Sequence, residues 1–235
     1  MSGFAQRLAG ILGQIEAACA RSGRDPSAVQ LVAVSKTHPP EAVDEAARCG
    51  CTVFGESRVP EAQQKIPVCS SGVSWHFIGH LQRNKVAPVV SLFSRIHSVD
   101  SLRLLERVES CAAEAGRQVS VCLQVNVSGE SSKFGLDPSE VPGVLAQAAS
   151  LRYTLVDGLM TMAPFVEDPE GARPHFRRLR TLRDAWVAQT GWPLDVLSMG
   201  MSHDFEVAVE EGATLVRVGT ALFGKRPKPV AGDGA

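Results

Sequence analysis

Short apolar runs alternate with amphipathic stretches along nearly the whole chain. We predict β-strands where apolar and β-branched residues cluster, near residues 30–36, 51–54, 74–78, 94–98, 119–127, 154–160, 194–197 and 214–218. The stretches between them have helical periodicity, which predicts helices near 3–20, 40–49, 57–65, 82–91, 100–115, 138–149, 169–189 and 203–211, with a short one after Gly219. This order favours an α/β fold, a parallel (β/α)8 barrel, with an open doubly wound sheet as the main competitor.

Composition narrows the class of protein. The chain has 235 residues, of which 44% are hydrophobic and 21% charged, and a net charge of −1. We expect a single domain over residues 1–235, with a core from about residue 28 to 226 and a flexible C-terminal tail rich in Lys, Pro and Gly.

Several locations and partners are not expected. The apolar runs are too short to span a membrane, no basic stripe suits nucleic acid, and the N-terminus lacks the pattern of a signal peptide. The six cysteines show no Cys-x-x-Cys spacing, which favours reduced thiols. A cytoplasmic protein is therefore expected.

The first predicted strand ends on a lysine. Residues 30–36 read Gln-Leu-Val-Ala-Val-Ser-Lys, a run typical of a buried parallel strand, and Thr-His-Pro-Pro then ends it. Lys36 should lie at the carboxyl end of the sheet, where α/β proteins bind ligands. Partial burial there favours the neutral amine, which is a usable nucleophile. The alternative is a lysine whose ammonium reaches solvent from the strand end.

Two loops of small residues follow the last two predicted strands. The first reads Ser198-Met199-Gly200-Met201-Ser202, and the second begins with Gly219-Thr220. Each could turn backbone N–H groups and a hydroxyl toward an anion, and in (β/α)8 barrels the loops at these positions often bind phosphate. A lysine that can form an imine and loops that can bind phosphate are the least that a binding site for pyridoxal 5′-phosphate (PLP) requires.

Arg217, late in the eighth predicted strand, could point at the pyridine nitrogen of such a cofactor. A guanidinium only donates hydrogen bonds, so the nitrogen would have to accept and stay unprotonated. An unprotonated ring is a poorer electron sink.

Longer strings extend these motifs. They are Leu-Val-Ala-Val-Ser-Lys (31–36), Phe-Gly-Glu (54–56), Trp-His-Phe-Ile-Gly-His-Leu-Gln (75–82) with Asn84-Lys85, Ile-His-Ser-Val-Asp-Ser (96–101), Gln-Val-Asn (124–126), Ser132-Lys133 with Gly135, Gly-Leu-Met-Thr-Met (158–162), Leu-Ser-Met-Gly-Met-Ser (197–202) with Asp204-Phe205-Glu206, and Arg-Val-Gly-Thr (217–220). On these strings the chain resembles the pyridoxal phosphate homeostasis protein family. The resemblance implies a single-domain TIM barrel related to the alanine racemase N-terminal domain, which is PLP fold type III.

By position, the resemblance implies PLP as the cofactor, held by a Schiff base at Lys36. It implies that Arg217 meets the ring nitrogen and that Met199 packs beside the cofactor. The implied phosphate contacts are Ser198, Gly200, Gly219 and Thr220.

Two positions depart from the family pattern. Ser57 stands where asparagine generally follows Gly-Glu, and His38 where a lysine often follows Lys-Thr. Serine is shorter than asparagine, so a contact that asparagine would make near the cofactor is expected to be lost or to run through water. A lysine at position 38 could accept the cofactor transiently, and histidine does not supply that amine.

Other residues have less specific interpretations. His76 and His80 would lie about 13 Å apart along a strand, so we expect no metal site and place them at the barrel mouth or in hydrogen bonds within the barrel. Met160 or Met162 could put a thioether inside the barrel, although core packing explains them equally well. Lys133 is a second candidate amine or a solvated loop residue.

Glu56 and Arg58 are expected to form a pair at a loop or helix start.

The resemblance implies a carrier that buffers or delivers PLP without substantial turnover, so no catalytic residue is assigned. The alternative is a PLP-dependent amino-acid racemase, which needs an acid–base group on each face of its substrate. In the alanine racemase relatives a second β-rich domain supplies a tyrosine for one face. The single tyrosine here, Tyr153, begins the sixth predicted strand, at the opposite end of the barrel from Lys36.

A metal-assisted hydrolase is a weaker third hypothesis, because clusters of His and Asp at strand ends are missing from the sequence. The expected partners are PLP and, as recipients, apo PLP enzymes. Nucleic acid and membranes are not expected partners, and the chain is expected to be a monomer or a weak dimer.

Overall fold

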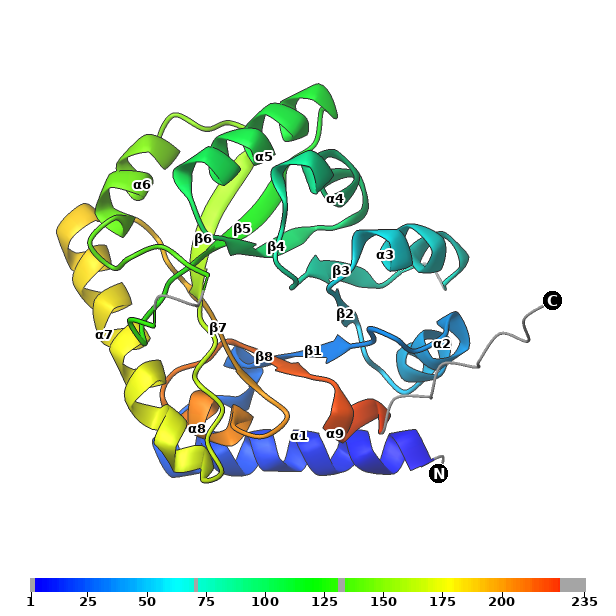
Figure 1. The fold of residues 1–235 in the computed structure, drawn as a ribbon. Helices are drawn as coiled ribbons and strands as arrows, with labels where there is room; N and C mark the ends of the chain where they lie inside the picture. Colours follow the sequence, from blue (N-terminus) through cyan, green and yellow to red (C-terminus); the bar gives the residue numbers. More distant parts are fainter. Residues whose placement is uncertain (1–2, 70–71, 131–133, 225–235) are drawn as a thin grey trace.

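Eight parallel strands close into a barrel in chain order (Figure 1). The computed structural model describes residues 3–69, 72–130 and 134–224. β8 pairs with β1, with Leu215 opposite Gln30, which closes the ring and rules out the open sheet. The strands are β1 (Gln30–Val34), β2 (Val53–Glu56), β3 (Ser74–Phe77), β4 (Arg95–Val99), β5 (Val119–Gln124), β6 (Thr154–Met160), β7 (Val196–Met201) and β8 (Leu215–Val218).

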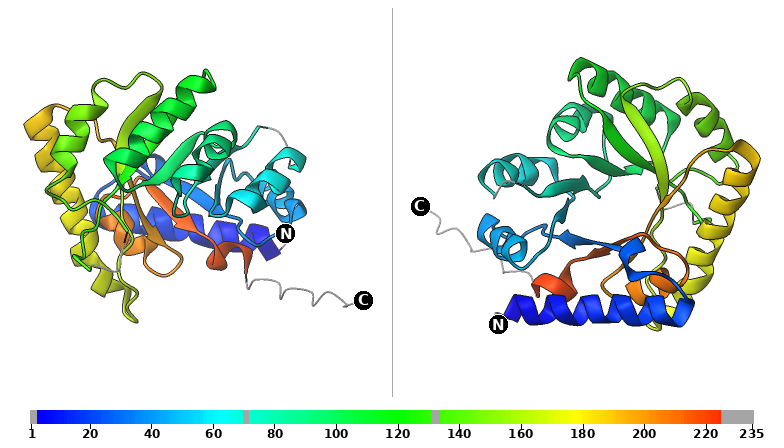
Figure 2. Two further views of the ribbon diagram at one scale, coloured as in Figure 1. Left: turned by 45° about the horizontal axis from the view of Figure 1, so that its top comes forward. Right: turned by 180° about the vertical axis from the view of Figure 1, so that it is seen from behind.

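A helix follows each strand and lies outside the barrel (Figures 1 and 2). The helices are α1 (Gly3–Ser22), α2 (Pro40–Arg48), α3 (Val59–Lys65), α4 (Val86–Leu92), α5 (Leu102–Glu114), α6 (Val141–Ala148), α7 (Arg173–Thr190), α8 (Phe205–Glu210) and α9 (Thr220–Phe223). α1 precedes the barrel and packs along α8 and α9, as both face-on views show. The predicted (β/α)8 barrel is confirmed.

The sequence of α5 shows why these segments are helical. Ser101 precedes the helix, and its hydroxyl accepts the N–H of Leu104, a side-chain N-cap. Apolar residues then recur on one face, at Leu104, Leu105, Val108 and later positions, and all of them are buried. That face packs against the strands, and the polar face is left to solvent.

Alternation along each strand divides the core into two layers. On β8, Val216 and Val218 belong to the large apolar core shared with the helices, whereas Leu215 packs inside the barrel with Val32. Arg217 lies between the two outward valines, so it points into the barrel. The inside of the barrel is thus apolar near the start of the strands and polar farther along.

Two predicted boundaries change the picture of the site. β1 ends at Val34, so Lys36 lies two residues beyond the strand, in the turn that follows. β7 begins at Val196 and runs on to Met201, because residues predicted as a turn still pair with β8, with an irregularity in register between Ser198 and Met201.

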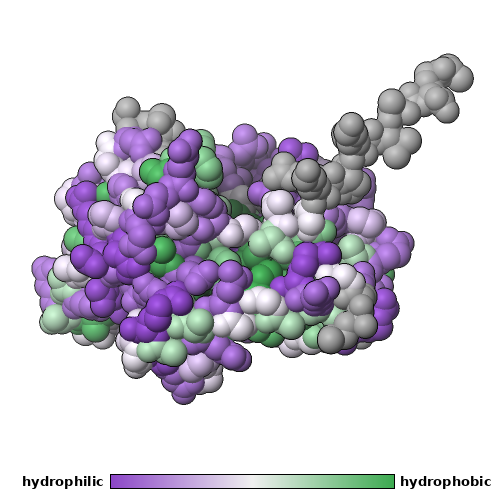
Figure 3. All heavy atoms as spheres, turned by 90° about the horizontal axis from the view of Figure 1, so that it is seen from below, coloured by the Kyte–Doolittle hydropathy of each residue, from purple (hydrophilic) through white to green (hydrophobic). Residues whose placement is uncertain are grey.

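The surface is mixed in character. Seen from the side on which α1 lies, it is mostly hydrophilic, with smaller apolar areas between (Figure 3). No helix in the described ranges is long and apolar enough to cross a membrane. The six cysteines, all described, are free thiols. The predicted tail and Lys133 lie outside the described residues.

Candidate functional site

A small cavity opens at the carboxyl ends of β1 and β8, and Lys36 lines it. Its volume is about 270 Å³. Several of its residues can donate hydrogen bonds, and the remaining walls are largely apolar. The lining residues are Val34, Lys36, Ile78, Met162, Met201, Ser202, His203, Arg217, Gly219 and Thr220. The cavity therefore lies where the strand-end lysine predicts a ligand site.

The turn that carries Lys36 is strained. Thr37, the next residue, has φ of 68°, in the left-handed region that a β-branched residue rarely adopts. Such a conformation costs about 1–3 kcal/mol and persists only where the surroundings fix it. The Thr37 N–H donates to the Glu61 carboxylate at 2.5 Å, and the His38 ring stacks on Phe223 with centroids 5.0 Å apart. His38 is thus packed on α9.

The ends of β7 and β8 are joined by a serine. The Ser202 hydroxyl accepts the N–H of Gly219 at 3.2 Å and that of Ala221 at 3.4 Å. Gly200 lets this part of β7 lie close to α8: its φ is 91°, and a Cβ there would lie 2.5 Å from the Cβ of Ala208. The two loops thus form one continuous wall of the cavity.

Beneath the cavity, a chain of buried polar groups starts at Arg217. The Arg217 guanidinium donates to the Ser198 hydroxyl and, at 3.1 Å, to the carbonyl oxygen of Thr161. Ser198 Oγ lies 2.7 Å from His97 Nδ1, and His97 Nε2 lies 3.0 Å from His76 Nδ1. Ser198 accepts from Arg217, and where its own proton goes to His97 Nδ1, His97 donates through Nε2 to His76.

Burial sets the charge of this chain. It lowers the pKa of His76 to about 3, with the nearby Arg95 adding to the effect. It holds the pKa of His97 well below the usual value, with His76 and Arg217 contributing. Burial lowers the pKa of Arg217 to about 10, which leaves the guanidinium charged at neutral pH. The histidines are therefore neutral, and the floor of the cavity carries one positive charge.

Four of the predicted site residues come together at the cavity: Lys36, Arg217, Gly219 and Thr220. The other three do not line it. Ser198 gives its hydroxyl to the buried chain, Met199 is fully buried in the core shared with the helices, and Gly200 is packed against α8.

Ser202 and His97 were not singled out as candidate site residues, and the bond of His76 to His97 was not predicted. Ser202 is the last residue of the small-residue loop that follows the seventh predicted strand, and its position in that loop could have marked it as a candidate. Both histidines were visible in the sequence, but the bond between them depends on how the strands are paired.

Other predictions have mixed outcomes. His76 forms a hydrogen bond within the barrel, as one of the two stated options expected, and His80 lies at the mouth beside Asp100, 3.4 Å away. Within the described ranges, no group of three or more His, Cys, Asp or Glu side chains is placed to hold a metal ion. Met162 lines the cavity, whereas Met160 is buried.

The expected pairing of Glu56 with Arg58 is wrong. Glu56 is fully buried and forms an ion pair with Lys65 on α3, with Nζ and Oε1 2.7 Å apart. β2 extends through Glu56, which turns the carboxylate toward α3, whereas Arg58 lies beyond the strand and is exposed.

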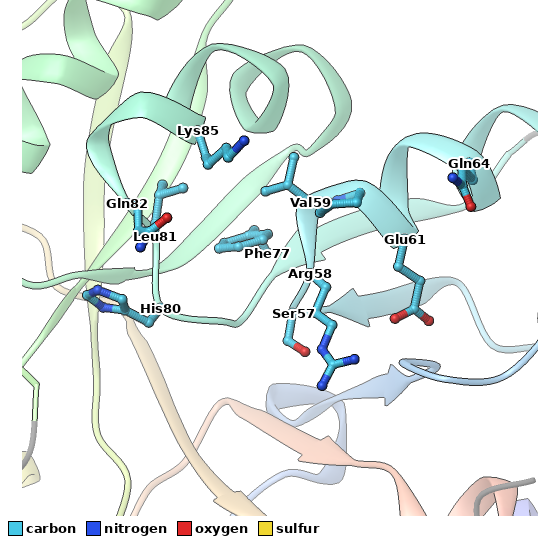
Figure 4. Close-up of a pocket in the computed structure, with 11 residues that line it drawn as sticks. Ser57, Arg58, Val59, Glu61, Gln64, Phe77, His80, Leu81, Gln82 and Lys85 are labelled. Atoms are coloured by element: carbon cyan, nitrogen blue, oxygen red, sulfur yellow. The ribbon is translucent and has the colours of Figure 1, made fainter. Parts of the chain in front are cut away.

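A second, larger cavity of about 560 Å³ adjoins the ends of β2 and β3 (Figure 4). Phe77 and Leu81 form its apolar floor, and Arg58 and Lys85 stand at its rim. Ser57, the departure from the family pattern, lines this cavity and not the one with Lys36.

The smaller cavity has a definite chemistry. The amine of Lys36 shares it with the buried Arg217 guanidinium and the hydroxyl groups of Ser202 and Thr220. Such a set suits a ligand with a carbonyl, a hydrogen-bond acceptor and an anionic group. Fold and cavity together define a parallel (β/α)8 barrel with a ligand-sized cavity at the carboxyl ends of its strands, lined by a lysine that follows β1.

Comparison with known proteins gives the family. The family model described as alanine racemase, N-terminal domain, matches residues 13–227. The chain belongs to the pyridoxal phosphate homeostasis protein family: it is 43% identical to the member from Aquifex aeolicus, over 94% of this chain and 97% of that protein. The member from Pseudomonas aeruginosa is 41% identical, over 96% and 97% of the two chains.

A solved structure with ligand extends the comparison. PipY of Synechococcus elongatus, whose structure was determined with PLP bound, is 40% identical to this chain and superimposes with a TM-score of 0.82. The match covers 94% of this chain and 100% of PipY.

Proposed function

We propose that this chain binds PLP through Lys36 and buffers or delivers it in the cytoplasm, as a monomer or weak dimer, without substantial turnover. The observation that carries the proposal is the placement of Lys36 in one cavity with Arg217 and the Ser202–Gly219 wall. The names of the relatives and the PLP in PipY support it.

The residues present fit the three polar parts of PLP. Bound PLP would supply an aldehyde that condenses with primary amines, and Lys36 is the amine in the cavity. The hydroxyl groups of Thr220 and Ser202 would take the phosphate, and the Gly219 N–H, which donates to Ser202 Oγ, would hold that serine in place. Arg217 would face the ring nitrogen as a donor, and its position is held from below by Ser198.

The resemblance implies a phosphate contact from Ser198, and this proposal gives that contact to Ser202 instead. Ser202 lines the cavity and contacts Gly219, so it takes the phosphate role. Ser198 orients Arg217 instead, and Gly200 allows β7 to pack closely against α8.

Delivery can be tested by transfer. Protein loaded with PLP is mixed with an apo PLP enzyme, and the recovery of that enzyme's activity is compared with release into a PLP trap. Recovery faster than release supports delivery. Recovery that only tracks release would contradict delivery and leave buffering as the function.

One observation keeps the racemase as a second candidate. His203 lines the same cavity as Lys36, and its Nε2 lies 3.0 Å from the carbonyl oxygens of Val166 and Glu167, to which it donates. Tyr153 immediately precedes β6, at the opposite end of the barrel. His203 is therefore a group in this cavity that could act as the acid–base group on the second face of a substrate amino acid.

Proton exchange separates the two candidates. The α-proton of L- and D-alanine, and of a wider amino-acid panel, is followed in D₂O. Exchange with inversion at about 1 s⁻¹ or faster, within the ordinary range for enzymes, would contradict the carrier proposal. Slow exchange without inversion supports it.

A further inference from the structure

Three charged residues, two of them buried and the third half-buried, form a cluster on the outer side of β1 and β2. We call Glu56, Glu61 and Lys65 the clamp. Lys65 is 5% exposed, and its ammonium donates to Glu56 Oε1 and Glu61 Oε1, both at 2.7 Å. Its third bond goes to the Ser35 carbonyl oxygen at 2.9 Å. An ammonium has three N–H donors, so this lysine is saturated.

The clamp holds the residues on both sides of Lys36. Before it, Ser35 is bound twice, because its hydroxyl also donates to Glu56 Oε1 at 2.8 Å. After it, the Thr37 N–H donates to Glu61 Oε1 at 2.5 Å. Glu61 is directed away from the floor of the larger cavity, formed by Phe77 and Leu81 (Figure 4).

The strain at Thr37 indicates what the clamp does. A β-branched residue at φ of 68° would relax if its surroundings released it. Its buried hydroxyl has no hydrogen-bond partner among the described residues. The bond from its N–H to Glu61 is therefore a direct restraint on this conformation, and relaxation would swing the Lys36 side chain away from the cavity.

We propose that the clamp is a positioning device for Lys36, with Lys65 as its central residue. The inference rests on the proposed function. In the step concerned, the Lys36 amine adds to the aldehyde carbon of PLP, a C=N bond forms, and the aldehyde oxygen leaves as water. The clamp residues do not line the cavity with Lys36, so they act through the turn and not on the cofactor.

The test must remove Lys65, which anchors both Glu61 and Ser35, without leaving a buried charge. Lys65→Met alone would leave the Glu56 carboxylate without its cation, so the test variant is Lys65→Met with Glu56→Gln. The matched control is Lys85→Met, which removes an exposed lysine at the rim of the larger cavity. Thermal unfolding first establishes that each variant is folded at the assay temperature.

Two ligands separate positioning from structure. With PLP, the rate of adduct formation is followed by visible absorbance and by borohydride trapping. We expect it to fall roughly 10- to 100-fold in the clamp variant, because small misplacements of reacting groups have effects of this size. Pyridoxine 5′-phosphate lacks the aldehyde, and we expect it to bind the clamp variant as it binds the wild-type protein. The Lys85→Met variant should match the wild type with both ligands.

A third variant tests the route. Thr37→Gly, added to the clamp variant, allows a positive φ without strain and should recover part of the adduct rate. No recovery would contradict action through Thr37.

The remaining outcomes are distinguishable. Equal loss of both ligands would make the clamp a structural element only, and an unchanged adduct rate would overturn the inference outright. No adduct on Lys36 in wild-type protein would overturn the proposed function itself.

Discussion

Replacing Glu211 by Gln should destabilise the protein substantially. Glu211 follows α8, its side chain is 5% exposed, and three arginines of α7 converge on its carboxylate. Arg177 Nη2 lies at 2.8 Å, and Arg173 Nη1 and Arg180 Nη2 both lie at 3.1 Å. Glutamine has nearly the same shape, but it loses the charge and turns an N–H donor toward the guanidinium groups.

The size of the loss follows from the burial of each partner. Removing one member of a buried ion pair costs about 3–5 kcal/mol. The side chains of Arg173, Arg177 and Arg180 are 23%, 58% and 40% exposed, respectively. Water can therefore hydrate their guanidinium groups when the carboxylate is removed, which makes the loss of stability smaller. We expect about 2–3 kcal/mol, since a hydrogen bond to a charged group contributes about 1.5–3 kcal/mol. For a chain of this length, that lowers the melting temperature by about 4–12 °C.

The loss should depend on pH. Burial alone would raise the pKa of Glu211, but hydrogen bonds from Arg177 and Arg173 hold it below its usual value. A carboxyl group whose pKa is lower in the folded state stabilises the protein above its unfolded pKa of about 4.3 and loses that effect as the pH falls through the folded pKa. The difference between wild type and variant should be constant at neutral pH and shrink in acid.

Urea unfolding followed by circular dichroism measures this difference. The control is Glu206→Gln, whose 36% exposed carboxylate binds Arg21 at 2.9 Å and should contribute less than about 1 kcal/mol. A loss for Glu211→Gln no larger than for the control would refute the reasoning, as would a difference that persists unchanged in strong acid.

Two further predictions concern the cavity and its floor. Thr220→Val should weaken PLP binding about 10- to 100-fold in equilibrium titrations, through one lost bond to a charged acceptor, and pyridoxal without phosphate should be nearly indifferent; equal losses would contradict the phosphate assignment. The folded-state pKa values of His76, about 3, and of His97, well below the usual value, mean that both histidines take up protons mainly on unfolding. Their stabilising effect is complete above the unfolded histidine pKa of about 6.5 and is lost as the pH falls below it. We therefore expect urea unfolding to show lower stability at pH 5 than at pH 7. Equal stability at the two pH values would contradict buried neutral histidines.

The order of the elements and part of the site could be predicted because their signals are local. The run from residue 30 to 36 and the prolines after it place Lys36 at a strand end without knowledge of any other strand. Arg217, Gly219 and Thr220 were likewise predictable, because β8 and the turn after it lie next to each other in the sequence.

The roles of Ser198 and Met199 depended on where β7 ends. The prediction ended that strand at residue 197, so both residues were assigned to a loop. The strand continues to Met201, and alternation then turns Ser198 into the barrel and Met199 toward the helices. Gly200 is a residue type typical of turns, and for that reason the sequence predicted the end of the strand too early.

Contacts between distant strands could not be predicted. His97 and Ser198 are 101 residues apart, and their hydrogen bond exists because the barrel closes with a particular register. The Glu56–Lys65 pair is closer in sequence, but it requires β2 to include Glu56 and α3 to pack over it. Local periodicity carries no information on either arrangement.

The most direct test of the account is the site of the covalent adduct. Protein incubated with PLP is reduced with borohydride, and the modified peptide is identified by mass spectrometry. The account predicts the adduct on Lys36, its loss in Lys36→Ala, and its retention in the matched variant Lys85→Ala. An unchanged adduct mass on the Lys36→Ala protein would contradict the central claim.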